Sequence, residues 1–208
     1  MEDSNNIENR IIEAAKTVFV REGYEATKMG DIATEAGISR TSLHYYFRTK
    51  ELLFEAIFGQ LMSTILPNVE IIMNQHSSIL EKLPLIIDQY LAAIRRNPLF
   101  PIFVVSEMNR DPEHLYHAIM KHSSRIEPIL RLQQQMMDEM EKGLIRKRPL
   151  VDTASTLLSL VVFPYLIRHT LTIVFLDRNQ EAFEEFLNRR KELIKEIMYV
   201  LLIPENKK

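Results

Sequence analysis

The sequence predicts an all-α protein of about nine to ten helices. Apolar residues recur in many segments with the i, i+4, i+7 spacing of amphipathic helices, and no segment has the two-residue alternation of a strand. The chain of 208 residues contains only five glycines, and three of them lie within the first 37 positions. Tight turns are therefore scarce beyond that point, which indicates long helices.

The composition is that of a globular chain, with 46% hydrophobic and 26% charged residues. Cysteine is absent, which excludes disulfides, thiol nucleophiles and cysteine-ligated zinc and suits the reducing cytoplasm where we expect the protein. The longest largely apolar run, 157–167, has 11 residues, whereas a helix needs ~20 to cross a bilayer. The first ten residues do not form a signal peptide. We therefore expect a soluble protein with no membrane partner.

The N-terminal region predicts three helices at about 7–22, 28–36 and 39–46. Gly23 and Gly37 are placed to end the first two helices, because glycine adopts the left-handed cap conformation without a steric penalty. Thr27 and Ser39 are placed to cap the second and third helices. Two short helices joined by a three-residue turn are typical of a helix-turn-helix.

The rest of the chain predicts further helices at about 50–65, 80–96, 99–109, 114–121, 126–142, 152–176 and 179–202. We expect Pro67 to kink or end its helix, and Pro84 to be tolerated in a first turn. The helix at 152–176 is apolar on nearly every side, so both its own subunit and a partner are expected to bury it. The helix at 179–202 has a single apolar stripe.

The segment 27–57 combines helix-packing residues with a basic surface. It reads TKMGDIATEAGISRTSLHYYFRTKELLFEAI, and no acid occurs between Ala36 and Lys50. Its expected packing residues are Ile32, Ala33, Ile38 and Leu43. The net charge of the chain is −2, but the position of charge matters more than its sum for a small docking surface. This segment therefore indicates a local anion-binding surface.

The residue types on the exposed side of this segment suit the major groove of DNA. Arg40 is suited to guanine O6 and N7, and hydroxyl groups contact bases or phosphates. Lys50 opens a helix, where its ammonium and the free N–H groups of the helix are expected to clamp one phosphate. The candidate DNA-binding residues are Thr27, Lys28, Ser39, Arg40, Thr41, Ser42, His44, Tyr45, Tyr46 and Lys50.

On these residues, and above all on the stretch LHYYFRTK at 43–50, the segment resembles the helix-turn-helix of TetR/AcrR family transcriptional regulators. The resemblance implies an N-terminal DNA-binding domain, at 1–50, followed by a helical ligand-binding and dimerisation domain, at 51–208. It also implies a homodimeric repressor that binds a palindromic operator and is released by a small molecule. Thr41 and His44 depart from the commonest family residues, so the operator sequence does not carry over.

The family resemblance further implies a pocket and a dimer interface in the larger domain. Homodimer contacts are expected through the helices at about 152–176 and 179–202. Ten methionines and ten phenylalanines suit a plastic cavity for a mostly apolar effector. The candidate lining residues are Phe58, Met62, Tyr90, Phe103, Met108, Met136, Met137, Phe163 and His169.

Other functions are disfavoured by the sequence. It lacks the glycine-rich phosphate loop, the Gly-x-Ser-x-Gly elbow and the His-Glu-x-x-His pair of common enzyme classes, so we expect no enzyme and no cofactor. A solvent-exposed cluster is preferred to a metal site for Asp111, Glu113, His114, His117 and His122. His169 is open to three interpretations: binding a ligand, forming a hydrogen bond in the core, or pairing across the dimer.

Overall fold

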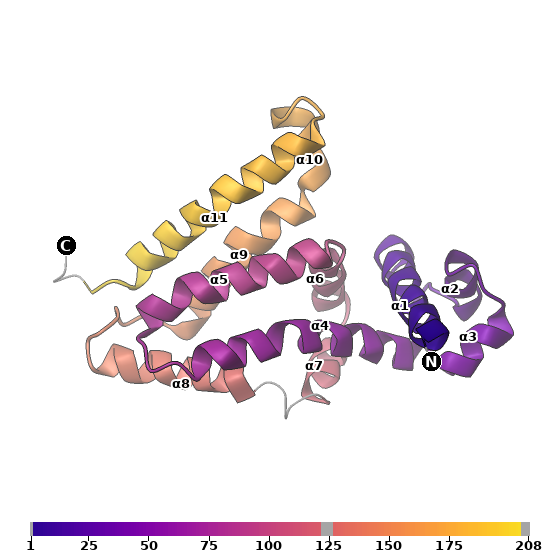
Figure 1. The fold of residues 1–208 in the computed structure, drawn as a ribbon, viewed down its shortest axis with the longest axis horizontal. Helices are drawn as coiled ribbons and strands as arrows, with labels where there is room; N and C mark the ends of the chain where they lie inside the picture. Colours follow the sequence, from indigo (N-terminus) through magenta and orange to yellow (C-terminus); the bar gives the residue numbers. More distant parts are fainter. Residues whose placement is uncertain (1, 122–126, 205–208) are drawn as a thin grey trace. The chain divides into compact units, whose positions relative to one another are not determined.

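The computed structural model describes residues 2–121 and 127–204, and these residues form eleven α-helices and no strand (Figure 1). The all-α prediction is confirmed. The helices are α1 (Glu2–Glu22), α2 (Met29–Glu35), α3 (Arg40–Tyr46), α4 (Lys50–Met73), α5 (Ile79–Arg96), α6 (Phe100–Arg110), α7 (Pro112–Met120), α8 (Glu127–Glu141), α9 (Leu150–Leu166), α10 (Arg168–Phe175) and α11 (Gln180–Leu202).

The chain divides into two compact units. The first comprises Met1–Thr64 and Asn97–Ser123, and the second comprises Ile65–Arg96 and Ser124–Lys208. Helix α4 begins in the first unit and ends in the second. The first unit thus contains α6 and α7 in addition to the three N-terminal helices. The domain boundary expected between residues 50 and 51 stays a prediction. The two compact units instead meet within α4, between Thr64 and Ile65.

The turns between the N-terminal helices follow local backbone chemistry. Gly23 and Gly37 have φ angles of +80° and +65°, which are the left-handed values that favour glycine. The Ser39 hydroxyl accepts a hydrogen bond from the N–H of Ser42 (3.0 Å) and so caps α3. The expected cap at Thr27 is wrong. Its buried hydroxyl donates to the Gly23 carbonyl (2.7 Å), and α2 begins one residue later than that cap would place it.

An aromatic cluster forms the core of the first unit. The rings of Phe54, Phe58 and Phe103 lie 5.1–5.5 Å apart between centroids, and Phe19 and Tyr24 pack against Phe54. Such tilted and edge-on arrangements are favoured by the ring quadrupoles. Helices α1, α4 and α6 are thereby joined around one apolar centre.

The second unit packs α5, α8, α9 and α11 around a separate core. Ile87 and Ile94 on α5 and Ile194 and Met198 on α11 are buried there. Asp88 of α5 forms ion pairs with Lys191 (3.0 Å) and Lys195 (2.9 Å) of α11.

The single helix expected at 152–176 is wrong, because α9 and α10 are separated at Ile167 and bent by 67°. Pro164 lies in the last turn of α9 and has no N–H to donate to the Leu160 carbonyl. Arg190 Nε of α11 donates to that carbonyl instead (3.1 Å). The missing helix hydrogen bond is thus replaced by a contact from another helix.

The other two helix prolines lie inside continuous helices. Helix α4 runs through Pro67 to Met73, so the proline does not end it. Pro84 lies beyond the first turn of α5, which starts at Ile79. Packing of the surrounding apolar faces evidently offsets the loss of one backbone hydrogen bond at each proline.

Among the described residues, α4 is long and apolar enough to cross a membrane, and α9 with α10 meets the same criterion only as a bent pair. Four apolar side chains of α4 are nonetheless almost fully buried within the first unit: Leu53, Phe54, Ile57 and Phe58. This burial is typical of a core helix in a globular protein.

A buried polar group joins α5 to α8. Lys82 is 2% exposed, and its Nζ donates to the Met73 carbonyl (3.3 Å) and to Gln135 Oε1 (2.8 Å). Glu139 is also buried. Its carboxylate accepts hydrogen bonds from the N–H of Ile79 (3.0 Å) and from Gln135 Nε2 (2.7 Å). Burial lowers the pKa of Lys82 while the charge of Glu139 opposes that shift.

Replacing Glu139 by alanine is expected to destabilise the protein by about 3 kcal/mol, because it leaves the Lys82 charge buried without its counter-charge. The measurement is urea unfolding followed by circular dichroism. Glu141→Ala removes an exposed carboxylate from the same helix and should change the stability by less than about 0.5 kcal/mol. Similar losses for both variants would contradict this account of Glu139.

Candidate nucleic-acid interface

Helix α3 presents most of the side chains that the sequence assigns to DNA. Arg40 and Thr41 are exposed, and Tyr45 is 82% exposed. The partly buried members are Ser42, His44 and Tyr46. On the opposite side, Leu43 is fully buried and anchors the helix. The helix therefore offers one polar, aromatic side to solvent and holds its position through the other.

The turn before α3 is fixed by contacts with α1 and α2. The N–H of Ile38 donates to the Ala33 carbonyl (3.0 Å). Arg10 Nη2 of α1 donates to the Ala36 carbonyl (2.7 Å), which lies at the end of α2. Ile32 and Ala33 are buried beneath the turn. These contacts make α2 and α3 a rigid pair.

Two further candidates lie near the start of α2. Lys28 is exposed, and its backbone N–H donates to the Asp31 carboxylate (3.0 Å). Its ammonium is thus on the protein surface with the candidates of α3. Thr27 is buried and its hydroxyl is already used within the loop, so its side chain is not placed for a phosphate contact.

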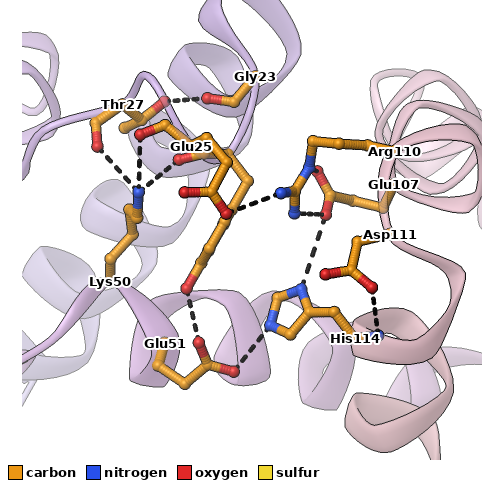
Figure 2. A network of polar contacts seen from close by, with 10 residues as sticks. Gly23, Glu25, Thr27, Lys50, Glu51, Glu107, Arg110, Asp111 and His114 are labelled. Atoms are coloured by element: carbon orange, nitrogen blue, oxygen red, sulfur yellow. Dashed lines mark hydrogen bonds and ion pairs between the residues drawn. The ribbon is translucent and has the colours of Figure 1, made fainter.

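Lys50 has a different role from the expected phosphate clamp. Its Nζ donates to the carbonyls of Tyr24 (2.6 Å), Glu25 (3.2 Å) and Thr27 (3.2 Å), as Figure 2 shows. The ammonium also lies 4.3 Å from the centroid of the Tyr24 ring. Three carbonyl oxygens and one ring face surround this ammonium. Lys50 therefore holds the α1–α2 loop against α4.

A second set of side chains connects the same loop to α6 and α7 (Figure 2). The Tyr24 hydroxyl donates to Glu51 Oε2 (2.6 Å), and His114 Nε2 lies 2.8 Å from Glu51 Oε1. Arg110 pairs with Glu107 and with Glu25 (2.9 Å). These residues join α4, α6, α7 and the loop within the first unit.

Burial and hydrogen bonding determine the protonation of Tyr24 and Glu51 in this network. Burial and the hydrogen bond to Glu51 raise the pKa of the Tyr24 hydroxyl well above its usual range. Burial acts to raise the pKa of Glu51, but hydrogen bonds from Tyr24 and His114 outweigh it, so that this pKa is lowered. Glu51 is therefore an ionised acceptor and Tyr24 a neutral donor at neutral pH.

Sequence reasoning did not find Tyr24, Glu51, Glu107 or Arg110, because their partners are distant in the chain and no local spacing marks them. It weighed a surface position against a metal ligand for His114 and preferred the surface, whereas His114 is partly buried and contacts Glu51. Asp111 caps α7 by accepting from the N–H of His114 (3.0 Å). No group of three or more potential metal ligands occurs among the residues with defined positions, and His122 lies outside them.

The nine expected effector-binding residues are divided between the two compact units. Phe58 and Phe103 belong to the aromatic core of the first unit. Met62 and Met108 also lie in the first unit but outside that core. The other five lie in the second unit: Tyr90, Met136, Met137, Phe163 and His169. Within the described part of the chain, Met136 is the one of the nine that lines the apolar cavity between α5, α8, α9 and α11.

The exposure of these residues corrects several expectations. Met108, Met137 and Phe163 are exposed large apolar side chains rather than cavity walls. Tyr90 is partly buried against the core of the second unit. His169 is exposed on α10, which excludes the interpretation that it forms a hydrogen bond in the core.

The last three helices of the second unit each carry exposed apolar side chains. They are Val151, Leu158, Phe163, Leu166, Ile173, Val174, Phe175, Leu193, Tyr199 and Val200. A soluble monomer rarely leaves so many large apolar groups in water on neighbouring helices. This apolar face on α9, α10 and α11 is therefore suited to a protein partner.

Residues 11–57 match the family model described as bacterial regulatory proteins, tetR family. Among curated relatives, the YfiR regulator of Bacillus subtilis is 49% identical over 47 residues, which is 23% of each chain. QacR of Staphylococcus aureus is 41% identical over 54 residues, covering 26% of this chain and 29% of QacR. The chain thus matches less than a third of the length of these two relatives.

Solved structures extend the similarity to the whole chain. A putative fatty acid metabolism regulator of Clostridium perfringens has a TM-score of 0.72 at 21% identity, covering 94% of this chain and 100% of that chain. A TetR family regulator from Marinobacter aquaeolei has a TM-score of 0.66 at 18% identity, covering 99% and 100%. At such identities the similarity concerns the fold.

The family match covers the helices that carry the exposed side of α3, and the fold similarity covers the helices that follow them. The N-terminal helices are thus similar to the tetR family of bacterial regulatory proteins, and the fold is similar to that of solved TetR family regulators.

Proposed function

We propose that the chain is a ligand-responsive transcriptional repressor that binds a palindromic operator as a homodimer and is released by a small, mostly apolar molecule. The observation that carries the proposal is the exposed side of α3. There the Arg40 side chain makes no hydrogen bond or ion pair with any described residue, and Thr41 and Tyr45 are exposed on the same helix. Operator binding places the protein in the cytoplasm.

The side chains of this surface divide into two roles. Arg40 is suited to read a guanine through paired hydrogen bonds to O6 and N7. Lys28, Thr41 and Tyr45 are suited to contact phosphates and sugars, which position the helix without reading sequence. Tyr45 lies edge-on to Tyr46 with their centroids 5.2 Å apart, and 82% of its side chain stays exposed for such contacts.

The homodimer is proposed to form through the apolar face on α9, α10 and α11. A two-fold interface buries the same side chains from each copy, so the energetic value of each contact is doubled. Two copies of α3 must lie ~34–36 Å apart to enter successive major grooves. An effector that favours another separation lowers the affinity for DNA, and a coupling of ~1–3 kcal/mol is enough for a repressor.

Footprinting the DNA upstream of the chain's own gene tests the operator proposal. Once a site is found, Arg40→Ala is expected to weaken binding to it by about 1–3 kcal/mol while changing binding to unrelated DNA much less. Arg48→Ala removes an equal charge from an exposed position outside α3. That control should weaken both DNA sequences alike, and the same behaviour from Arg40→Ala would contradict its reading role.

Lys50 and Lys28 provide a matched pair that separates folding from phosphate contact. Lys50→Ala leaves three carbonyls without a donor, so it should lower the free energy of unfolding by about 1–3 kcal/mol and leave the salt dependence of DNA binding unchanged. Lys28→Ala should leave the free energy of unfolding unchanged and reduce the slope of log K against log salt by about one unit. Thermal unfolding and binding titrations in increasing salt measure both properties, and exchanged results would refute this division.

The proposed interface is tested by Leu193→Glu, which places a charge on the apolar face of α11. Burial of one leucine contributes about 1.5–3 kcal/mol, and the two-fold axis applies the loss twice, so the variant is expected to be monomeric by analytical ultracentrifugation. Ile71→Glu introduces the same charge at an exposed position of α4. Dimers in both variants, or monomers in both, would place the interface elsewhere.

A further inference from the structure

The imidazole ring of His114 lies between two carboxylates that come from different helices of the first unit (Figure 2). Its Nε2 is 2.8 Å from Oε1 of Glu51 on α4, and its Nδ1 is 3.8 Å from Oε2 of Glu107 on α6. The ring is carried by α7 and packs against Phe54, with 4.3 Å between the ring centroids. One side chain thus stands where three helices meet.

The Nδ1 atom of this ring is buried and has no hydrogen-bond partner among the described residues. In a neutral histidine one ring nitrogen is a donor and the other an acceptor, whereas both are donors in the charged ring. A neutral ring that donates to Glu51 therefore directs the lone pair of Nδ1 toward the carboxylate of Glu107. A charged ring instead presents an N–H to each carboxylate. The two contacts are thus complementary to the charged ring.

The cluster around the ring contains more carboxylates than cations. Its charged and titratable groups are Glu25 and Tyr24 on the α1–α2 loop, Glu51 on α4, Glu107 and Arg110 on α6, and Asp111 on α7. Arg110 serves two of the carboxylates, because it pairs with both Glu107 and Glu25. Asp111 accepts the backbone N–H of His114 (3.0 Å). A proton on the ring therefore offsets part of an excess of negative charge.

Glu51 depends on His114 for its ion pair. The ammonium of Lys50 is bound to three loop carbonyls, and Lys121 pairs with another carboxylate of α4. Burial acts to raise the pKa of Glu51, but hydrogen bonds from Tyr24 and His114 and the charge of His114 outweigh it. This coupling is reciprocal, so the ionised carboxylate stabilises the charged ring. Histidine is also the side chain whose ordinary charge change falls between about pH 5 and 8.

We propose that His114 is a proton-dependent link that fastens α7 to α4 and α6, and that it holds the first unit together most firmly when the ring is charged. Loss of the proton leaves the contact with Glu51 and removes the donor that faces Glu107. Because the same unit carries α3, the link makes operator binding sensitive to pH. This regulatory meaning rests on the proposed function, whereas the link itself does not.

The experiment compares thermal unfolding of the unaltered full chain and of His114→Gln, followed by circular dichroism at several pH values. Glutamine supplies one N–H donor and cannot take up a proton. A proton that the folded chain binds through both carboxylates stabilises it at low pH and no longer does so once the pH is high enough to remove it. We expect the unaltered chain to melt about 2–4 °C above the variant at about pH 6, and this difference to be lost by about pH 9.

His117→Gln is the matched control, because it replaces an exposed histidine of the same helix. Its melting temperature should differ from that of the unaltered chain by the same small amount at every pH. Nitrogen-15 NMR of the histidine rings gives a second measurement that needs no variant, with the His114 ring identified by its contact with Phe54. We expect hydrogens on both ring nitrogens at about pH 6 and on one at about pH 9.

The proposal is overturned if the His114 ring keeps one protonation state across this range. It is also overturned if the difference in melting temperature between the unaltered chain and His114→Gln does not depend on pH, or if His117→Gln shows the same pH dependence. Neither measurement contains DNA. A chain that has this link but binds no operator would therefore refute the proposed function alone.

Discussion

The first unit depends on the ammonium of Lys50 and the three backbone carbonyls that it binds in the α1–α2 loop. Carbonyls withdrawn from water are costly unless a donor reaches them, and this loop has no helix or sheet to supply one. The side chain on α4 therefore determines where the loop lies. Because α2 follows the loop and α3 packs on α2, the direction of α3 is set by a residue that the sequence had assigned to phosphate.

The same loop is held from the other side by the network around Glu51. Tyr24 and His114 both contact this carboxylate, and Arg110 reaches Glu25 while lying over the Tyr24 ring. Helices α6 and α7 are thus integral to the unit that carries α3. Contiguous polar contacts of this kind connect α7 to the loop that precedes α2.

Local chemistry explains what the sequence predicted. Gly23, Gly37 and Ser39 end or cap their helices as expected, because left-handed glycine and the serine cap depend only on neighbouring atoms. Thr27 was misassigned since a closer acceptor, the Gly23 carbonyl, competes for its hydroxyl. The break at Ile167 was missed although Pro164 is visible in the sequence. Its partner Arg190 is 30 residues from the freed Leu160 carbonyl, and no pattern along the chain announces such a contact.

The buried polar side chains of the second unit differ in whether they have hydrogen-bond partners. Lys82 and Glu139 are surrounded by partners from three segments of chain, which is what a group retained for stability requires. Thr153 is buried to a similar degree, but its hydroxyl has no hydrogen-bond partner among the described residues. Valine would fill the same space without the cost of desolvating a hydroxyl.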